Sequence, residues 1–155
     1  MSEVPGLMGV VVVAAGRSSR MDGVDKQLAS LRGAPVISHS LRVFEASSHV
    51  GPVVLVMAAD KLEEGRAAVR SGAFSKVVAV VTGGERRQDS VRIGLDVLAE
   101  QPAGPPEFVA IHDGARPFID DALLDRGLAT AQKVGAAIAA IPVKDTIKVA
   151  PHRLV

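Results

Sequence analysis

The chain has 155 residues, a formal net charge of +1, 48% hydrophobic and 23% charged residues, and no cysteine, tryptophan or tyrosine. A charge so close to neutral gives no overall field toward nucleic acid or anionic lipid, and few aromatic residues are left for stacking on bases. The composition is that of one globular domain, and the lack of cysteine excludes disulfides, thiolate metal sites and thiol nucleophiles.

No part of the sequence predicts a secretory signal or a membrane span. The N-terminus has no basic start, and Pro5 and Gly6 interrupt it before an apolar run develops. The longest apolar stretches, at 10–15 and 136–141, are far shorter than the ~20 residues that cross a bilayer. We therefore expect a soluble, cytoplasmic protein with a single domain over residues 1–155 and neither nucleic-acid nor membrane partners.

Short apolar runs alternate with helical patterns along the chain. In order, the pattern predicts strands and helices as follows: a strand at 10–14, a helix carrying Ile37, Leu41 and Phe44, strands at 53–58 and 77–82, a helix carrying Val91, Leu95 and Leu98, a strand at 108–112, a capped helix at 120–134 that ends at Gly135, and a strand at 136–143. The runs are too continuously apolar for half-exposed strands, so burial on both faces is expected. This alternation predicts an α/β domain with a mainly parallel sheet, whose active site lies beyond the carboxyl ends of the strands.

The first predicted strand runs into a basic loop of small residues. The loop reads AAGRSSRM over 14–21, and Lys26 follows five residues later. Small residues let the backbone approach a ligand, and the freed N–H groups can cradle phosphate oxygens. Arg17 and Arg20 add positive charge there, although the spacing fits neither the dinucleotide-binding glycine pattern nor the P-loop. The loop indicates phosphate binding; the alternative is a solvated turn with incidental arginines.

Two further strand ends lead into polar loops. TGGERRQDSV, over 82–91, combines a tight glycine turn with Asp89 and Ser90, which could equally be helix caps beside a surface pair of arginines. IHDGARP, over 111–117, places Asp113 where a carboxylate could hold Mg²⁺ together with substrate phosphates, and Arg116 where a guanidinium could bind phosphate. The alternative is that Asp113 caps a turn and Arg116 is its ion-pair partner. His112 is expected to pack and to form hydrogen bonds.

In combination these motifs resemble a known family. AAGxxxRM after a strand, GGExRxDSV, HDGARP and a later PVKDTIK at 142–148 are similar in order and separation to the 2-C-methyl-D-erythritol 4-phosphate cytidylyltransferases, from about Val10 to Val149. The resemblance implies a Rossmann-like α/β/α nucleotidyltransferase fold and transfer of the cytidylyl group of CTP to a polyol phosphate, with release of pyrophosphate, in non-mevalonate isoprenoid biosynthesis. Two alternatives stay open: a ribitol-5-phosphate cytidylyltransferase, and a nucleotide-binding module without catalysis.

The resemblance also implies roles for individual residues. Arg20 and Lys26 would hold the CTP phosphates and stabilise the charge that builds at the α-phosphorus. Asp113 would coordinate Mg²⁺, and Arg116 and Thr146 would hold the phosphate of the second substrate. Cytosine and ribose would be bound by the two glycine-bearing loops, through Ala14, Ala15, Gly16, Gly84, Glu85 and Ser90.

The chain departs from the family pattern at three points. Asp25 precedes Lys26 where a proline is usual, which could loosen the loop or tune the lysine, and Gly114 replaces an alanine. Family members run on for roughly half as much chain again, so Val155 falls where the resemblance places the start of a dimerisation arm. We expect a homodimer in the full-length protein, with a second metal-binding carboxylate and a lysine beyond Val155.

Overall fold

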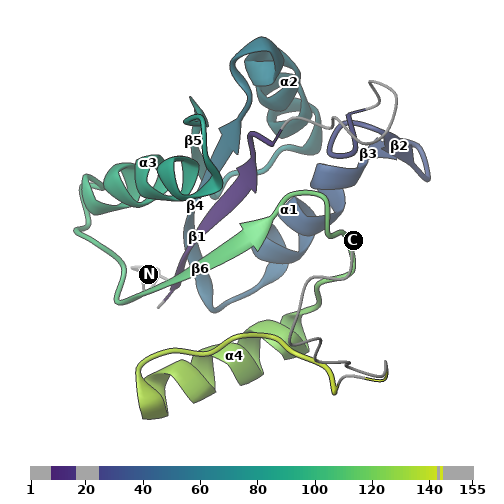
Figure 1. The fold of residues 1–155 in the computed structure, drawn as a ribbon. Coiled ribbons are helices and arrows are strands. Elements are labelled where there is room, and N and C mark those ends of the chain that lie inside the picture. Colours follow the sequence, from purple (N-terminus) through teal and green to yellow (C-terminus); the bar gives the residue numbers. More distant parts are fainter. Residues whose placement is uncertain (1–7, 17–24, 143, 145–155) are drawn as a thin grey trace, which may run out of the picture.

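Four parallel strands form the central sheet of the computed structural model, which describes residues 8–16, 25–142 and 144 (Figure 1). The strands stand in the order β5-β4-β1-β6, with bounds Val77–Thr82, Val50–Met57, Met8–Ala14 and Phe108–Asp113. The chain starts at the central strand β1, builds outward through β4 and β5, and returns to place β6 on the other side of β1. The strand order thus reverses between β1 and β6, which is where open α/β sheets bind their ligands.

Successive side chains of β1 enter two different cores. All seven residues of β1 are buried. Val10 and Val12 belong to a core shared with the helices α1 (Val36–Ala46), α2 (Leu62–Gly72) and α4 (Asp121–Val134), whereas Val11 and Val13 belong to a second core with α3 (Arg87–Ala99). Alternation along a strand sends neighbouring residues to opposite faces. The sheet is therefore covered on both faces, and the predicted α/β/α layering is confirmed.

Three of the helices, α1, α3 and α4, lie where the sequence patterns predict. In α1, Ile37, Leu41 and Phe44 are at most 1% exposed. The helix α4 begins after Asp120, whose Oδ1 accepts a hydrogen bond of 2.7 Å from the backbone N–H of Leu123, and it ends at Gly135 in the left-handed conformation. Within the described residues, none of the helices combines the length and the apolar composition of a membrane span.

The backbone of the helix α3 lies close to the sheet at Gly94. A Cβ built on Gly94 would come within 2.4 Å of Val11 Cγ1, a separation that van der Waals repulsion forbids. Glycine at this position lets the backbone of α3 rest directly on the side chains of β1. The first turn of α3, which begins at Arg87, is thereby held beside the carboxyl end of the sheet.

Four elements have no counterpart among the predicted ones. The helix α2 was missed, as were the 3₁₀ turn η1 (Ala59–Lys61) and a hairpin of two residues per strand, β2 (Ser30–Leu31) with β3 (Ala34–Pro35). The hairpin turns through Arg32 and Gly33, both with positive φ. Strands this short carry no apolar period that a sequence pattern could reveal.

Two expectations about strands are wrong. The outer strands β5 and β6 are only partly buried, with Val78 46% and Ile111 38% exposed, because each has a neighbouring strand on one side only among the described residues. The predicted strand at 136–143 is not formed: residues 136–142 have no regular structure, and Ile138 is 90% exposed. An apolar run needs a neighbouring strand to pair its backbone, and in the described structure β6 pairs only with β1.

A polar latch joins the end of α1 to the turn before β5. The Glu45 carboxylate accepts hydrogen bonds of 3.0 Å from the backbone N–H groups of Ser75 and Lys76 and a third from the Ser75 hydroxyl. In return, Lys76 Nζ donates to the carbonyls of Phe44 and Ser47 at 3.3 and 2.6 Å. Burial alone would raise the pKa of Glu45, but the hydrogen bonds from Ser75 and Lys76 outweigh it, and the pKa lies below its ordinary value.

Candidate active site

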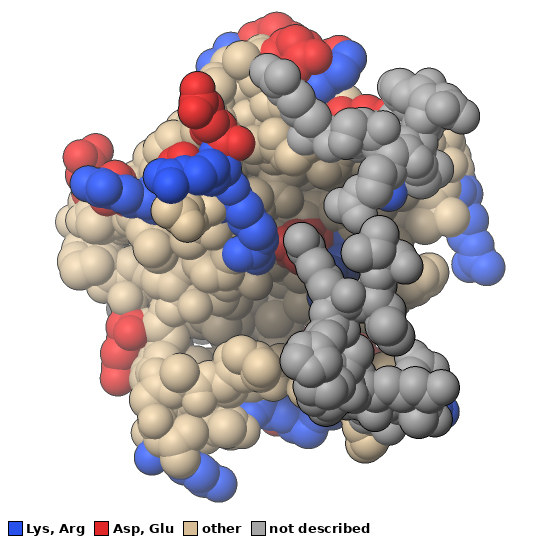
Figure 2. Space-filling model, in the orientation of Figure 1, with Lys and Arg blue, Asp and Glu red and all other residues tan. Residues whose placement is uncertain are grey.

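A crevice of about 1070 Å³ opens at the carboxyl ends of the strands. Loops that follow β1, β4, β5 and β6 all contribute to its wall, together with the segment that leads into α1; the lining residues are Val13, Ala15, Gly16, Gln27, Ala58, Ala59, Asp60, Gly83, Gly84, Glu85, Arg86, Arg87, Ser90, Asp113, Gly114 and Ala115. Figure 2 shows basic side chains that extend toward a hollow on this face, where atoms of acidic residues are also exposed. The three loops singled out in the sequence thus meet at one site.

The loop after β1 offers free backbone to a ligand. Ala14 is buried at 2% exposure, Ala15 lines the crevice, and Gly16 is exposed. No atom of the described residues lies within 4 Å of a Cβ built on Gly16, so packing does not require glycine there. Close approach of a ligand to the backbone would require it. Arg17 and Arg20 lie outside the described residues.

The segment before α1 is held by its backbone and by Asp25. The Asp25 carboxylate accepts a hydrogen bond of 3.0 Å from the backbone N–H of Gln27, a turn of the kind that aspartate side chains commonly stabilise. Aspartate in place of the expected proline therefore supports the turn and does not loosen it. Lys26 is exposed and follows directly, but it does not line the crevice, whereas its neighbour Gln27 does.

Ser90 holds the loop after β5 in a tight conformation. Its hydroxyl accepts a hydrogen bond of 3.1 Å from the Gly84 N–H and donates one of 3.3 Å to the Arg86 carbonyl. A Cβ on Gly83 would lie 2.4 Å from Ala15 Cβ and 2.6 Å from Ser90 Oγ, so the loops after β1 and β5 touch at this glycine. Of the two predicted caps, Asp89 has this role, because its Oδ2 accepts a hydrogen bond of 3.2 Å from the Arg86 N–H at the start of α3. Ser90 instead shapes the loop, and its 2% exposure leaves little hydroxyl surface for a ligand.

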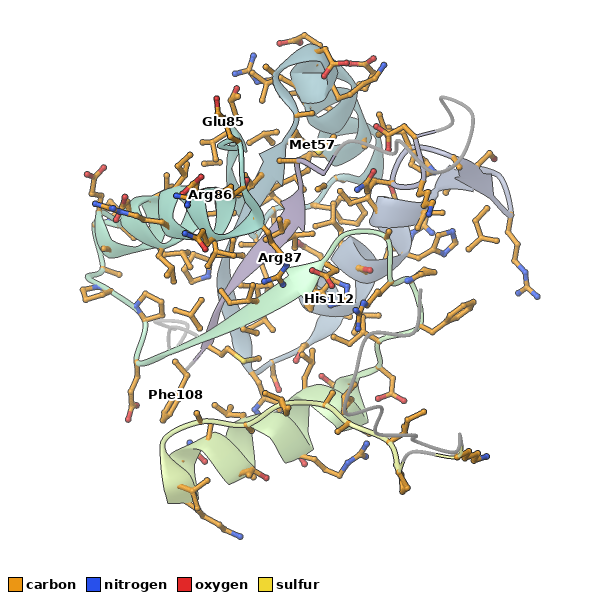
Figure 3. All side chains as sticks on the ribbon, in the orientation of Figure 1. Met57, Glu85, Arg86, Arg87, Phe108 and His112 are labelled. Atoms are coloured by element: carbon orange, nitrogen blue, oxygen red, sulfur yellow. The ribbon has the colours of Figure 1, made fainter. Side chains whose placement is uncertain are left out.

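The two adjacent arginines at the start of α3 have different partners. Arg86 pairs with Asp89 within the first turn, at 2.9 Å from NH2 to Oδ1. Arg87 crosses the crevice to Asp113, with Nε at 3.1 Å and NH2 at 2.8 Å from Oδ1. Figure 3 shows Arg87 reaching from α3 toward β6, near His112. The pair of arginines is therefore not simply a surface feature, because Arg87 bridges two walls of the site.

Asp113 ends β6 between two guanidinium groups. Besides Arg87, Arg116 places its Nε 3.2 Å from Asp113 Oδ2, and the Arg116 backbone N–H donates to the Asp113 carbonyl at 3.0 Å. The ion pair with Arg116 is the alternative that the sequence left open, and the structure contains it. Both arginine side chains are well exposed, at 60% and 77%, so these ion pairs are weak and can exchange for other partners.

His112 and Ser40 fix the turn that carries Asp113 and Arg116. His112 Nε2 lies 3.1 Å from Ser40 Oγ and 3.1 Å from the carbonyl oxygen of Arg116. The Ser40 hydroxyl donates a hydrogen bond of 3.0 Å to the same carbonyl. The His112 ring packs edge-on against Phe44 at 5.2 Å between centroids. Burial lowers the pKa of His112, so the ring is neutral at pH 7. The predicted packing role of His112 is confirmed.

The donor set in the crevice suits a metal ion that arrives with phosphates. No three His, Cys, Asp or Glu side chains within the described ranges are grouped so that they could hold a metal ion by themselves. Mg²⁺ is commonly held by one or two carboxylates, with substrate phosphates and water completing its shell. Asp113 supplies one carboxylate on the crevice wall, so the residues fit Mg²⁺ bound together with a nucleotide.

Several crevice residues were not predicted. The wall formed by Ala58, Ala59 and Asp60 follows β4, and the rule that parallel strands end at one edge would have pointed to it. Gln27 carried no signal beyond its position beside Lys26. Of the predicted residues, Ala15, Gly16, Gly84, Glu85, Ser90 and Asp113 share the crevice; Ala14, Lys26 and Arg116 lie outside its wall, and Arg20 and Thr146 lie outside the described residues.

Comparison with known proteins identifies the family of the chain. The sequence profile of the 2-C-methyl-D-erythritol 4-phosphate cytidylyltransferases matches residues 8–155. A protein of that name from Dehalococcoides mccartyi strain CBDB1 is 47% identical over 149 residues, which are 96% of this chain and 63% of the relative. One from Bacillus velezensis is 42% identical over 140 residues, 90% of this chain and 58% of the relative.

Solved structures agree with the sequence relatives. A crystal structure of a 4-diphosphocytidyl-2C-methyl-D-erythritol synthase aligns with a TM-score of 0.71 at 25% identity, over 92% of this chain and 63% of that one. The chain thus spans less than two thirds of the length of these relatives. Because the profile covers nearly the whole chain and the sequence identities reach 47%, the chain belongs to the 2-C-methyl-D-erythritol 4-phosphate cytidylyltransferase family.

Proposed function

We propose that this protein transfers the cytidylyl group of CTP to 2-C-methyl-D-erythritol 4-phosphate and releases pyrophosphate, as a step of isoprenoid biosynthesis. The observation that carries the proposal is the convergence of three strand-end loops on one crevice beside the point where the strand order reverses. Family membership supports the choice of substrates.

The Asp113 carboxylate and the free backbone on the crevice wall suit such a transfer. An oxygen of the substrate phosphate attacks the α-phosphorus of CTP in line, and the P–O bond to the pyrophosphate breaks. The attacking phosphate is already ionised at neutral pH, so catalysis consists mainly of positioning and electrostatic stabilisation. Bound Mg²⁺ would neutralise charge on the nucleotide phosphates, and Asp113 is the residue proposed to hold it.

Each loop has a proposed part in this chemistry. The backbone at Gly16 approaches the nucleotide, and Arg20 and Lys26 bind its phosphates. The loop of Gly84 and Glu85, held in shape by Ser90, binds cytosine and ribose together with Ala14 and Ala15. Arg116 and Thr146 bind the phosphate of the polyol. The exposed guanidinium of Arg116 supports this role, because its ion pair with Asp113 can exchange for a phosphate at little cost.

The quaternary state and the compartment also belong to the proposal. The family resemblance supports a homodimer for the full-length enzyme, with Mg²⁺ as its cofactor. The absence of cysteine fits a cytoplasmic location, where thiols stay reduced.

Substrate comparison tests the proposed activity. Pyrophosphate release is measured with CTP and either 2-C-methyl-D-erythritol 4-phosphate or ribitol 5-phosphate, at matched Mg²⁺. We expect turnover with the methylerythritol substrate; faster turnover with ribitol 5-phosphate would assign the other cytidylyltransferase activity. Calorimetry with CTP in parallel identifies a binding module, which would bind the nucleotide and release no pyrophosphate with either substrate.

A further inference from the structure

One buried side chain in the crevice wall has a polar atom that no other described residue pairs. Gln27 lines the crevice and is only 8% exposed. Within the described residues, its buried Oε1 has no hydrogen-bond partner. An unsatisfied buried acceptor destabilises a protein relative to an apolar side chain of the same size. Glutamine at this position therefore needs a reason other than stability.

The Gln27 side chain is not what anchors its own segment. The backbone N–H of Gln27 donates to Asp25 Oδ1 at 3.0 Å, and its carbonyl accepts from the Ile37 N–H at 3.0 Å. Both backbone groups are thus paired, and they fix the segment to the first turn of α1. The amide at the end of the side chain takes no part in these contacts.

Gln27 lies at the Asp113 end of the crevice. Ile37, whose N–H binds the Gln27 carbonyl, also approaches the loop after β6: a Cβ on Gly114 would lie 3.5 Å from Ile37 Cδ1. The loop of Gly84 belongs to the opposite wall, beyond β4 and next to α3. If the proposed function holds, the Asp113 end is where the nucleotide phosphates meet the second substrate.

We propose that the Gln27 amide binds a hydroxyl group of a bound substrate, and so contributes to recognition of a sugar or polyol. This inference rests on the proposed function. A hydroxyl both donates and accepts, so it can pair with either end of the amide, and rotation about the soft terminal torsion brings either end to the ligand. Phosphate oxygens only accept and cannot satisfy Oε1. The hydroxyl belongs to the ribose of CTP or to the polyol phosphate.

The test is a thermodynamic cycle that measures binding affinity when a hydroxyl of the ligand, the Gln27 amide, or both are removed. Gln27→Met keeps the chain length and removes both polar groups, and Gln132→Met, on the exposed face of α4, is the matched control. Calorimetry compares CTP with its 2′-deoxy and 3′-deoxy forms. A second arm titrates 2-C-methyl-D-erythritol 4-phosphate and its singly deoxygenated analogues in the presence of the α,β-methylene analogue of CTP, in which transfer is blocked.

The expected result is coupling between one ligand hydroxyl and Gln27. Wild type should lose about three- to tenfold in affinity when that hydroxyl is removed, the usual value of one hydrogen bond, and Gln27→Met should lose nothing further. Coupling in the first arm assigns the ribose, and coupling in the second assigns the polyol. The melting temperature of ligand-free Gln27→Met should equal or exceed that of wild type, because the unpaired acceptor is gone.

Other outcomes overturn the inference. If wild type binds both ligands and no hydroxyl deletion is coupled to Gln27, the amide does not read a hydroxyl, and the proposed function stands without it. A lowered melting temperature of Gln27→Met with unchanged affinities would make the residue structural. If wild type binds neither CTP nor the polyol phosphate, the proposed function and this inference both fail.

Discussion

Replacing Asp113 by asparagine separates the two roles that the site leaves open for this residue. Asp113→Asn keeps the size of the side chain and one oxygen acceptor, and it removes the charge. If Asp113 only pairs with Arg87 and Arg116, the change weakens two ion pairs. If it holds Mg²⁺, the change removes the protein carboxylate that the metal needs.

The structure sets the size of the effect on stability. The Asp113 side chain is 34% exposed, and those of Arg87 and Arg116 are 60% and 77% exposed. Ion pairs this exposed contribute about 0.2–1 kcal/mol each, so the mutant loses at most about 2 kcal/mol. For a chain of this length that corresponds to a decrease in melting temperature of no more than about 8 °C.

The effect on activity should be far larger. We expect turnover to fall by on the order of 10² or more, the scale of a lost electrostatic contact to the transition state, and the remaining activity to require more Mg²⁺. Pyrophosphate release across a Mg²⁺ titration measures both quantities. Where turnover is too low to follow, Mg²⁺-dependent binding of CTP by calorimetry gives the same comparison.

A neighbouring pair of arginines supplies the control. Arg87→Met breaks the ion pair to Asp113 and leaves the carboxylate in place, and Arg86→Met removes the adjacent charge, whose partner is Asp89. The reasoning is refuted if Asp113→Asn shows the Mg²⁺ dependence of wild type, or if Arg87→Met reproduces all its effects. Asp113 would then be an ion-pair partner that shapes the turn.

Three further outcomes are expected. Gly16→Ala should leave the melting temperature unchanged, because a Cβ there meets no described atom within 4 Å, yet weaken CTP binding in calorimetry; unchanged binding would remove this backbone from the site. Lys26→Ala should lower kcat by on the order of 10² with little change in melting temperature, and near-normal turnover would exclude it from the mechanism. Glu45→Gln should destabilise the protein at pH 7. Folding lowers the pKa of Glu45, so this stabilisation is complete above the unfolded-state pKa of about 4.3 and is lost as the pH falls through the folded-state pKa. Chemical denaturation should therefore show that the difference in free energy of unfolding between wild type and mutant shrinks in acid. A difference that does not change with pH would refute the proposed role of the Glu45 contacts.

Apolar runs and helical spacings in the sequence predicted individual strands and helices. They could not predict which strands find a partner in the folded sheet. β1 and α1 were predictable because Val10 to Val13 form an unbroken apolar run and Ile37, Leu41 and Phe44 recur at helical spacing. The run at 136–143 is also continuously apolar, yet 136–142 form no strand, because an apolar run cannot supply a neighbouring strand. Pattern alone cannot distinguish the two cases.

The candidate site divides in the same way. The strand-end loops were predictable because glycine and charged residues follow directly on apolar runs, and the crevice contains all three loops. The bridge from Arg87 to Asp113 spans 26 positions and depends on how α3 lies over the sheet. Gln27 is likewise visible only in three dimensions, because its burial and its unpaired oxygen are properties of the packing.

The contact between Gly94 and Val11 determines how far α3 lies from the sheet, and so where its first turn stands at the crevice. Glycine places no side chain between α3 and β1. A methyl group at Gly94 would lie 2.4 Å from Val11 Cγ1, and the helix would have to move away from the sheet by about 1 Å to relieve this contact. The helix is rigid, so this movement would be carried seven residues along to Arg87, at the rim of the crevice. A displacement of about 1 Å among reacting groups can cost on the order of 10² in rate. Gly94→Ala is therefore expected to displace one wall of the crevice from inside the protein core, without changing any residue that lines the crevice.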